Sequence, residues 1–142
     1  MAKSSASVLV ADDNRVNRLL LKRHLELLGH HVTAVENGMQ ALQRLRDEKF
    51  DILVLDIEMP ELDGFQVLEH LFTDPLFRDF PVIVTSSLEG VENLVRCIEL
   101  GAEDYLIKPV DFQALSRVTP QLKLDWALFK PAAEGIRNAK TV

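Results

Sequence analysis

The stretch DILVLDIEMPELDGF, residues 51–65, decides the fold. Its apolar run ILVLD (52–56) ends in a carboxylate, Asp56, and the turn-forming residues Pro60 and Gly64 follow. A continuous apolar run without polar alternation is typical of a strand in a parallel sheet that is covered on both faces. In such sheets the working site lies at the carboxyl ends of the strands. Asp56 is therefore the first candidate functional residue.

Four further short apolar runs recur along the chain. They are SVLVA (7–11), HVTAV (31–35), VIVTS (82–86) and YLIK (105–108). Segments with helical spacing lie between the runs, and strands separated by helices pair in parallel rather than as hairpins. The alternation predicts an α/β fold, an open doubly wound sheet of five parallel strands with helices on both faces.

Two of the intervening segments carry pronounced apolar stripes, which are typical of amphipathic helices. In the segment after Asn14 the stripe consists of Val16, Leu20 and Leu27, and Leu21, Leu25 and Leu28 broaden it. The clearest helix of the chain has apolar residues at i, i+3, i+4 and i+7, namely Val91, Leu94, Val95 and Ile98. We interpret Cys97 in this helix as an ordinary, semi-buried thiol.

Composition excludes several classes of protein. A length of 142 residues fits one domain, and a net charge of −6 disfavours a nucleic-acid partner, because phosphate backbones attract basic surfaces. Cys97 is the only cysteine, which excludes an internal disulfide and suits a reducing compartment. No apolar run approaches the roughly 20 residues of a membrane span, and the first residues do not resemble a signal peptide. We expect a soluble cytoplasmic protein without a membrane partner.

Chemically competent side chains follow four of the five expected strands. They are Asp12, Asp13, Asp56, Ser86 and Lys108. Three neighbouring carboxylates repel one another, so either one of them binds a proton or a cation lies between them, and an all-oxygen site of this kind suits Mg²⁺. A metal held by acids beside a lysine and a hydroxyl favours phosphoryl chemistry, in which a carboxylate serves as the nucleophile.

Four segments together resemble the CheY-like receiver domain of a two-component response regulator. They are VLVADDN (8–14), DILVLDIEMPELDGF (51–65), PVIVTSS (81–87) and GAEDYLIKPV (101–110). They appear in the order and at the spacing of that family and span residues 7 to about 116. The resemblance implies a flavodoxin-like (βα)5 fold.

The resemblance also implies a role for each residue of the site. Asp56 would accept the phosphoryl group, and Lys108 would contact it. Asp12, Asp13 and Asp56 would hold Mg²⁺ together with the backbone carbonyl of Glu58.

Three further positions match the switch elements of the family. Ser86, five residues after Pro81, stands where the family has its switch hydroxyl, and Tyr105 matches the switch aromatic. The bond between Lys108 and Pro109 is cis in the family. Ser87 is a departure, because the family usually has Ala or Gly at this position.

Each of these residues also has a plainer interpretation. Asp12 and Asp13 could cap the following helix, Lys108 could be a surface lysine, and Tyr105 could serve packing alone. For Glu58 two interpretations stay open. Either only its backbone carbonyl takes part in the site, or its side chain contacts the metal or obstructs an attacking water.

The resemblance implies a phosphorylation-dependent switch. Its phosphodonor would be a sensor histidine kinase or a histidine phosphotransfer protein. Its only chemistry would be self-catalysed transfer and autodephosphorylation, so it would not be an enzyme with an external substrate. A magnesium phosphohydrolase would want an Asp where Glu58 stands. A binding module that had lost phosphorylation would lack some of Asp13, Asp56 or Lys108.

The last part of the chain departs from the family. We expect a receiver domain over 7–119 and an extension or linker over 120–142, because Pro120 interrupts the last helix. Apolar residues in 121–129 indicate a second helical stretch there. This stretch would pack on the domain, pair with a second copy of the chain as a homodimer, or lead to an effector domain.

Overall fold

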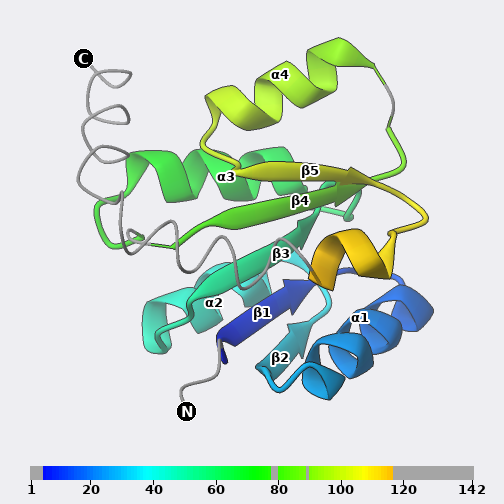
Figure 1. The fold of residues 1–142 in the computed structure, drawn as a ribbon. Coiled ribbons are helices and arrows are strands. Elements are labelled where there is room, and N and C mark those ends of the chain that lie inside the picture. The colour runs from blue at the N-terminus through cyan, green and yellow to red at the C-terminus, as the bar shows by residue number, and fades with distance from the viewer. Residues whose placement is uncertain (1–4, 78–79, 89, 117–142) are drawn as a thin grey trace.

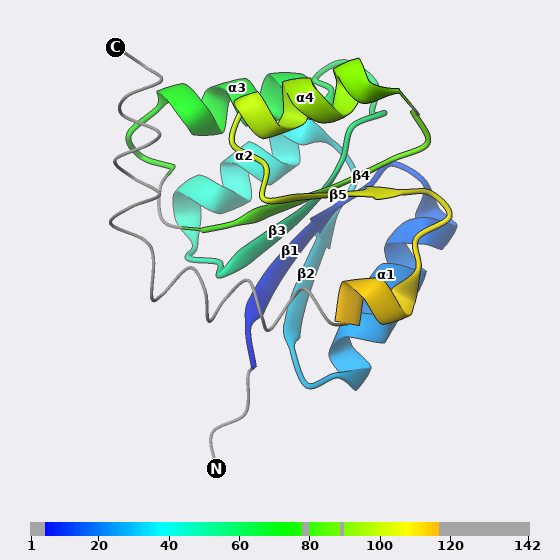
Figure 2. The same cartoon turned by 45° about the horizontal axis from the view of Figure 1, so that its top comes forward.

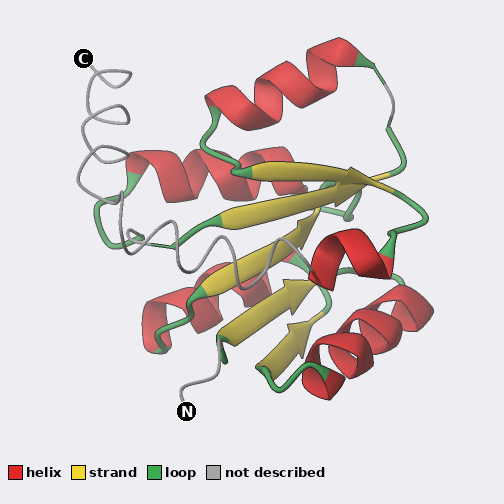
Figure 3. Cartoon of the chain, in the orientation of Figure 1, coloured by secondary structure: helices red, strands yellow, loops and turns green. Residues whose placement is uncertain are grey.

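The chain folds as an alternating series of strands and helices (Figures 1 and 3). The computed structural model describes residues 5–77, 80–88 and 90–116. The strands are β1 (Ser7–Ala11), β2 (His31–Val35), β3 (Ile52–Asp56), β4 (Val82–Ser86) and β5 (Asp104–Ile107). The helices are α1 (Arg15–Leu27), α2 (Gly38–Asp47), α3 (Gly64–Thr73) and α4 (Val91–Glu99), and residues 112–116 are also helical. The expectations for residues 120–142 lie outside the described residues.

All described strands pair in parallel, in the order β2-β1-β3-β4-β5. The predicted doubly wound sheet is therefore confirmed. The order reverses between β1 and β3, and in sheets of this type ligands bind beside such a reversal, at the carboxyl ends of the strands. The ends of β1 and β3 consequently become the centre of the molecule's working edge.

The sheet lies between two helical layers (Figure 2). One apolar core includes Leu53, Leu55 and Val84 and lies on the side of α2 and α3. The other includes Val54, Ile83 and Leu115, with Leu21 and Leu25 from α1 packed into it. Successive residues of the central strands thus enter opposite cores, which is why the apolar runs of these strands show no polar alternation before their carboxyl ends.

The predicted apolar stripe of α1 faces the core only in part, and that of α4 does not face it. In α1 the broadening residues Leu21 and Leu25 are buried, whereas Val16, Leu20 and Leu27 are exposed. In α4 only Cys97 is buried, whereas Val91, Leu94, Val95 and Ile98 are exposed. Helix α4 lies over the edge strand β5 (Figure 1), where the sheet ends. Only a narrow part of the α4 surface therefore packs into the core.

Cys97 also differs from the prediction, since it is fully buried rather than semi-buried. Burial raises the pKa of the thiol to about 11, although the nearby Arg96 charge opposes this shift. A thiol with so high a pKa is almost entirely protonated at neutral pH and is a poor nucleophile. Cys97 is therefore a packing residue.

Candidate functional site

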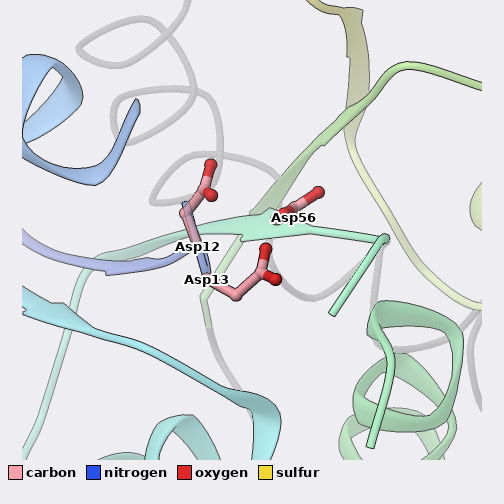
Figure 4. A group of neighbouring side chains, drawn as sticks. All are labelled: Asp12, Asp13 and Asp56. Carbon is pink, nitrogen blue, oxygen red and sulfur yellow. The ribbon is translucent and has the colours of Figure 1, made fainter. Parts of the chain in front are cut away.

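Three carboxylates meet at the ends of β1 and β3 (Figure 4). Asp12 and Asp13 directly follow β1, and Asp56 is the last residue of β3. The register that pairs Ala11 with Leu55 brings the two strand ends side by side. As a result, carboxylate oxygens of the three residues lie within 4.8 Å of one another.

Local hydrogen bonds fix the two buried acids. Asp56 is 1% exposed, and its Oδ1 accepts the backbone N–H of Glu58 at 3.0 Å. Asp12 is also buried, and its Oδ1 accepts the N–H of Asn14 at 2.9 Å. Asn14, in turn, caps α1 by accepting the N–H of Asn17. The sharp turn after each strand therefore orients its carboxylate without help from the rest of the site.

Lys108 joins the acids from the other side. It directly follows β5, and its Nζ lies 3.1 Å from Asp56 Oδ1 and 3.6 Å from Asp12 Oδ2. Its backbone N–H donates to the Ser86 carbonyl, and the bond to Pro109 is cis. Its side chain is only 18% exposed, so the surface-lysine interpretation does not describe its position.

The acids leave two oxygens open to a cation. Within the described residues, Asp12 Oδ2 and Asp56 Oδ2 are buried and have no hydrogen-bond donor. A buried oxygen without a donor is costly unless a proton, water or cation satisfies it. Together with the exposed Asp13, these oxygens form the donor set that a hard divalent cation requires. The residues present therefore fit Mg²⁺.

Burial and charge set the protonation of the site in opposite directions. Desolvation, followed by the negative charge of Asp12, raises the pKa of Asp56 to about 7 against the opposing effect of Glu58 N–H and Lys108. Burial by itself would lower the pKa of Lys108, but its contacts with Asp56 and Asp12 raise it overall. Lys108 consequently stays charged at neutral pH, and without a metal Asp56 holds a proton up to about pH 7.

This proton makes the stability of the metal-free protein depend on pH. The folded pKa of Asp56, about 7, lies above its ordinary value of 3.8, so the folded state binds the extra proton between these values. The stability that this proton contributes is fully present below the unfolded-state pKa of Asp56 and is lost as pH rises through its folded-state pKa. In EDTA we expect the free energy of unfolding of the native chain to fall over this range, relative to Asp56→Asn, by on the order of a few kcal/mol.

Urea unfolding of both chains at about pH 4, 5.5 and 7.5 measures this difference. Carboxylates remote from this site contribute equally to both chains and cancel in the comparison. With saturating Mg²⁺ the difference in unfolding free energy between the two chains should depend less on pH, because the cation replaces the proton. Parallel pH profiles for the two chains without metal would contradict the assignment of the proton to this site.

The Glu58 side chain points to the loop after β4. Its Oε1 accepts the Ser87 N–H at 2.6 Å and the Ser86 hydroxyl at 3.2 Å, and its Oε2 accepts the Ser87 hydroxyl. Burial acts to raise the pKa of Glu58, but these hydrogen bonds and the Lys108 charge lower it overall. Glu58 is thus a carboxylate at neutral pH.

The remaining switch candidate lies on β5. The hydroxyl of Tyr105 donates to the Leu88 carbonyl at 2.7 Å, and Leu88 N–H donates to Ser86 Oγ at 2.8 Å. Ser86 is fully buried and Tyr105 half-buried. The structure therefore links Ser86 and Tyr105 through a single residue of the loop between them.

The structure also shows contacts that sequence reasoning missed. Arg18 donates to the carbonyl of Asp12 at 2.9 Å. Thr85 is paired with Asp56 in the sheet, and its buried Oγ1 has no hydrogen-bond partner among the described residues. The binding of Ser87 by the Glu58 carboxylate was likewise missed. The unusual serine at position 87 was the only signal of it in the sequence.

Comparisons with known proteins agree with this geometry. The model of the family described as the response regulator receiver domain matches residues 8–119. Among curated proteins, the two-component response regulator ARR3 of Arabidopsis thaliana is 34% identical over 94% of this chain. The transcriptional regulatory protein ZraR of Klebsiella oxytoca is 36% identical over 90% of it. The chain spans 62% and 27% of the lengths of these two relatives.

Solved structures show the same fold. The receiver domain of the Francisella response regulator 1452 has a TM-score of 0.80 and 32% identity, with 84% of this chain and 98% of that chain covered. The receiver domain of a sensor histidine kinase from Pseudomonas aeruginosa has a TM-score of 0.74 and 28% identity at the same coverage. That structure has a magnesium ion coordinated in its active site cleft. No helix among the described residues has the length and apolar character needed to cross a membrane.

Proposed function

The chain belongs to the family of response regulator receiver domains, which are phosphorylation-dependent signalling switches, and from this premise we propose that Asp56 is its phosphoacceptor. The observation that carries the proposal is the buried contact of Asp56 with Lys108 at 3.1 Å, beside Asp12. Among the described residues, Asp56 is the one carboxylate that both ends a central strand and contacts Lys108. Receiver domains are switches rather than enzymes with a turned-over substrate.

The proposed step is phosphoryl transfer to a carboxylate. One Asp56 oxygen forms a bond to phosphorus as the bond between phosphorus and the donor breaks, and the donor keeps that electron pair. The phosphodonor is a phosphohistidine of a sensor histidine kinase or of a histidine phosphotransfer protein. Lys108, whose Nζ lies 3.1 Å from Asp56 Oδ1, would stabilise the oxygens of the transferred group with its positive charge. Hydrolysis of the acyl phosphate at the same site returns Asp56 to its free form.

Asp12, Asp13 and Asp56 are the residues that would hold Mg²⁺, with the Glu58 backbone carbonyl as a further ligand. The two buried carboxylate oxygens without a donor support this assignment. When bound, Mg²⁺ supplies positive charge that neutralises phosphoryl oxygens. The turn after β1 orients the Asp12 carboxylate for this role, because the N–H of Asn14 donates to its Oδ1.

Ser86 and Tyr105 would transmit the change. The Ser86 hydroxyl would turn to the phosphoryl oxygens, and Tyr105 would follow the loop that it now contacts through Leu88. Such a change is a shift between two positions of the loop, driven by contacts that exist only in the phosphorylated state.

The proposal for the whole chain is a cytoplasmic receiver over 7–119 with an extension over 120–142. Its partners would be the phosphodonor protein and either a second copy of the chain or an effector domain. A regulator such as ZraR, of which this chain spans 27%, illustrates the second arrangement. A nucleic-acid or membrane partner of this chain is not part of the proposal, since its net charge is −6.

Intact-mass spectrometry after incubation with acetyl phosphate tests the function. With Mg²⁺ we expect one phosphoryl adduct per chain, and with EDTA we expect none, because the acids would then repel the donor. Beryllofluoride, which mimics a phosphoryl group on an aspartate, should bind only in the presence of Mg²⁺. A chain that neither forms the adduct nor binds beryllofluoride would contradict the proposal.

A further inference from the structure

The loop that follows β4 is held at two points in the structure. At one point the Glu58 carboxylate accepts hydrogen bonds from Ser86 and from both the N–H and the hydroxyl of Ser87. At the other, Tyr105 donates to the carbonyl of Leu88. Glu58 belongs to the segment after β3 and Tyr105 to β5, so residues 86–88 are tied to both neighbouring strands.

The Ser86 hydroxyl cannot serve Glu58 and a phosphoryl group together. A serine hydroxyl has one proton to donate. In this structure its oxygen already accepts from Leu88 N–H, and its proton is directed to Glu58 Oε1 at 3.2 Å. A phosphoryl group on Asp56 would need the same proton. The contact to Glu58 must therefore break before Ser86 binds a phosphoryl oxygen.

Charge also opposes the hydrogen bonds of Glu58 to the serines once Asp56 carries a phosphoryl group. Glu58 follows Asp56 by two residues, and the positive charge of Lys108 acts on the carboxylates of both residues. A phosphoryl group would add about two negative charges at Asp56, while Lys108 remains one positive charge. Repulsion between the phosphoryl group and Glu58 would weaken the hydrogen bonds to Ser86 and Ser87.

We propose that Glu58 and Ser87 form a clasp that holds residues 86–88 in the unphosphorylated position, and that phosphorylation of Asp56 opens it. This inference rests on the proposed function and adds two positioning residues to it. The Ala or Gly usual at position 87 in the family would lack the hydroxyl that Glu58 binds here. In the free state the hydrogen-bond partners of the Glu58 side chain are the two serines.

The clasp must raise the free-energy cost of reaching the phosphorylated conformation. A ligand that binds one of two conformations gains apparent affinity when the other is destabilised. The Ser87→Ala variant removes one hydrogen bond of the clasp and changes no charge. We therefore expect it to bind beryllofluoride, with saturating Mg²⁺, more tightly than the native chain by roughly two- to tenfold, the equilibrium effect of one hydrogen bond.

A titration followed by amide NMR signals of residues 86–88 measures this affinity. Ser87→Thr keeps the hydroxyl and should bind like the native chain. Glu58→Gln should also bind more tightly, and it is compared with Glu61→Gln, which removes the same charge from an exposed residue of the same segment. A role in fold stability alone would lower the unfolding midpoint of Ser87→Ala in urea without tightening the binding of beryllofluoride.

The outcomes separate the two proposals. If the native chain fails to bind beryllofluoride with Mg²⁺, the proposed function itself is wrong. If the native chain binds and Ser87→Ala binds equally or more weakly, only the clasp is overturned. Equal tightening in Glu58→Gln and Glu61→Gln also overturns it, because charge alone would then explain the effect.

Discussion

The Asp56→Asn variant is expected to form no phosphoryl adduct with acetyl phosphate and Mg²⁺. The amide oxygen of asparagine carries no negative charge and is a far weaker nucleophile than a carboxylate. The substitution keeps the size of a side chain that is 1% exposed, so the core around it is unchanged. Intact mass after incubation measures the adduct, and urea unfolding verifies that the variant is folded.

The matched control is Asp47→Asn, which makes the same chemical change at an exposed residue at the end of α2. This variant should reach the adduct yield of the native chain. An adduct on Asp56→Asn at the native yield would place the phosphoacceptor elsewhere. Peptide mapping of that adduct would then identify the true phosphoacceptor.

The Gly64→Ala variant is expected to lose a large part of its stability. A Cβ at this position would lie 2.6 Å from Ile57 Cα and 2.7 Å from the Asp56 carbonyl oxygen. Both atoms belong to the backbone that leaves β3, so no side-chain rotation relieves the collision. We expect a loss of roughly 3 kcal/mol in the free energy of unfolding, at the upper end of overpacking effects. Urea unfolding measures it.

The same collision should reach the chemistry, because the backbone that must move carries Asp56. Phosphorylation by acetyl phosphate is expected to be slower in Gly64→Ala even under conditions where the variant is folded. Gly29→Ala is the control, since its Cβ would meet no atom within 4 Å and only its positive φ of 96° is unfavourable. That variant should lose about 1 kcal/mol. Equal losses for the two variants would show that the contact at Gly64 is relieved at little cost.

The strands could be predicted to within one residue. Each of the five strands has the bounds of its apolar run, except that β5 begins at Asp104 and ends at Ile107, so that Lys108 follows it. A strand covered on both faces is built mainly of apolar residues, and the length of its apolar run therefore indicates the length of the strand. The meeting of Asp12, Asp13 and Asp56 also follows from the sequence, because parallel strands bring their carboxyl ends to one edge.

The helices were harder to orient than to detect. Helical spacing correctly indicated α1 and α4, and it placed exposed residues such as Val16 and Val91 on the same apolar stripes as a core-facing helix would need. Periodicity shows that apolar residues share a face, and it does not show how much of that face the sheet covers. The buried Leu21 and Cys97 were assigned by packing against the sheet, which the sequence of a single helix does not contain.

The sequence by itself determined the alternation of strands and helices and the edge at which the acids, the hydroxyl and the lysine gather. These depend on local pattern and on the directions of parallel strands. Only the tertiary structure decided which oxygens are satisfied, that burial raises the pKa of Asp56 to about 7, and that Glu58 binds Ser87 across the loop. Hydrogen bonds and desolvation depend on distances of a few ångströms between residues far apart in the chain, and only the folded arrangement sets those distances.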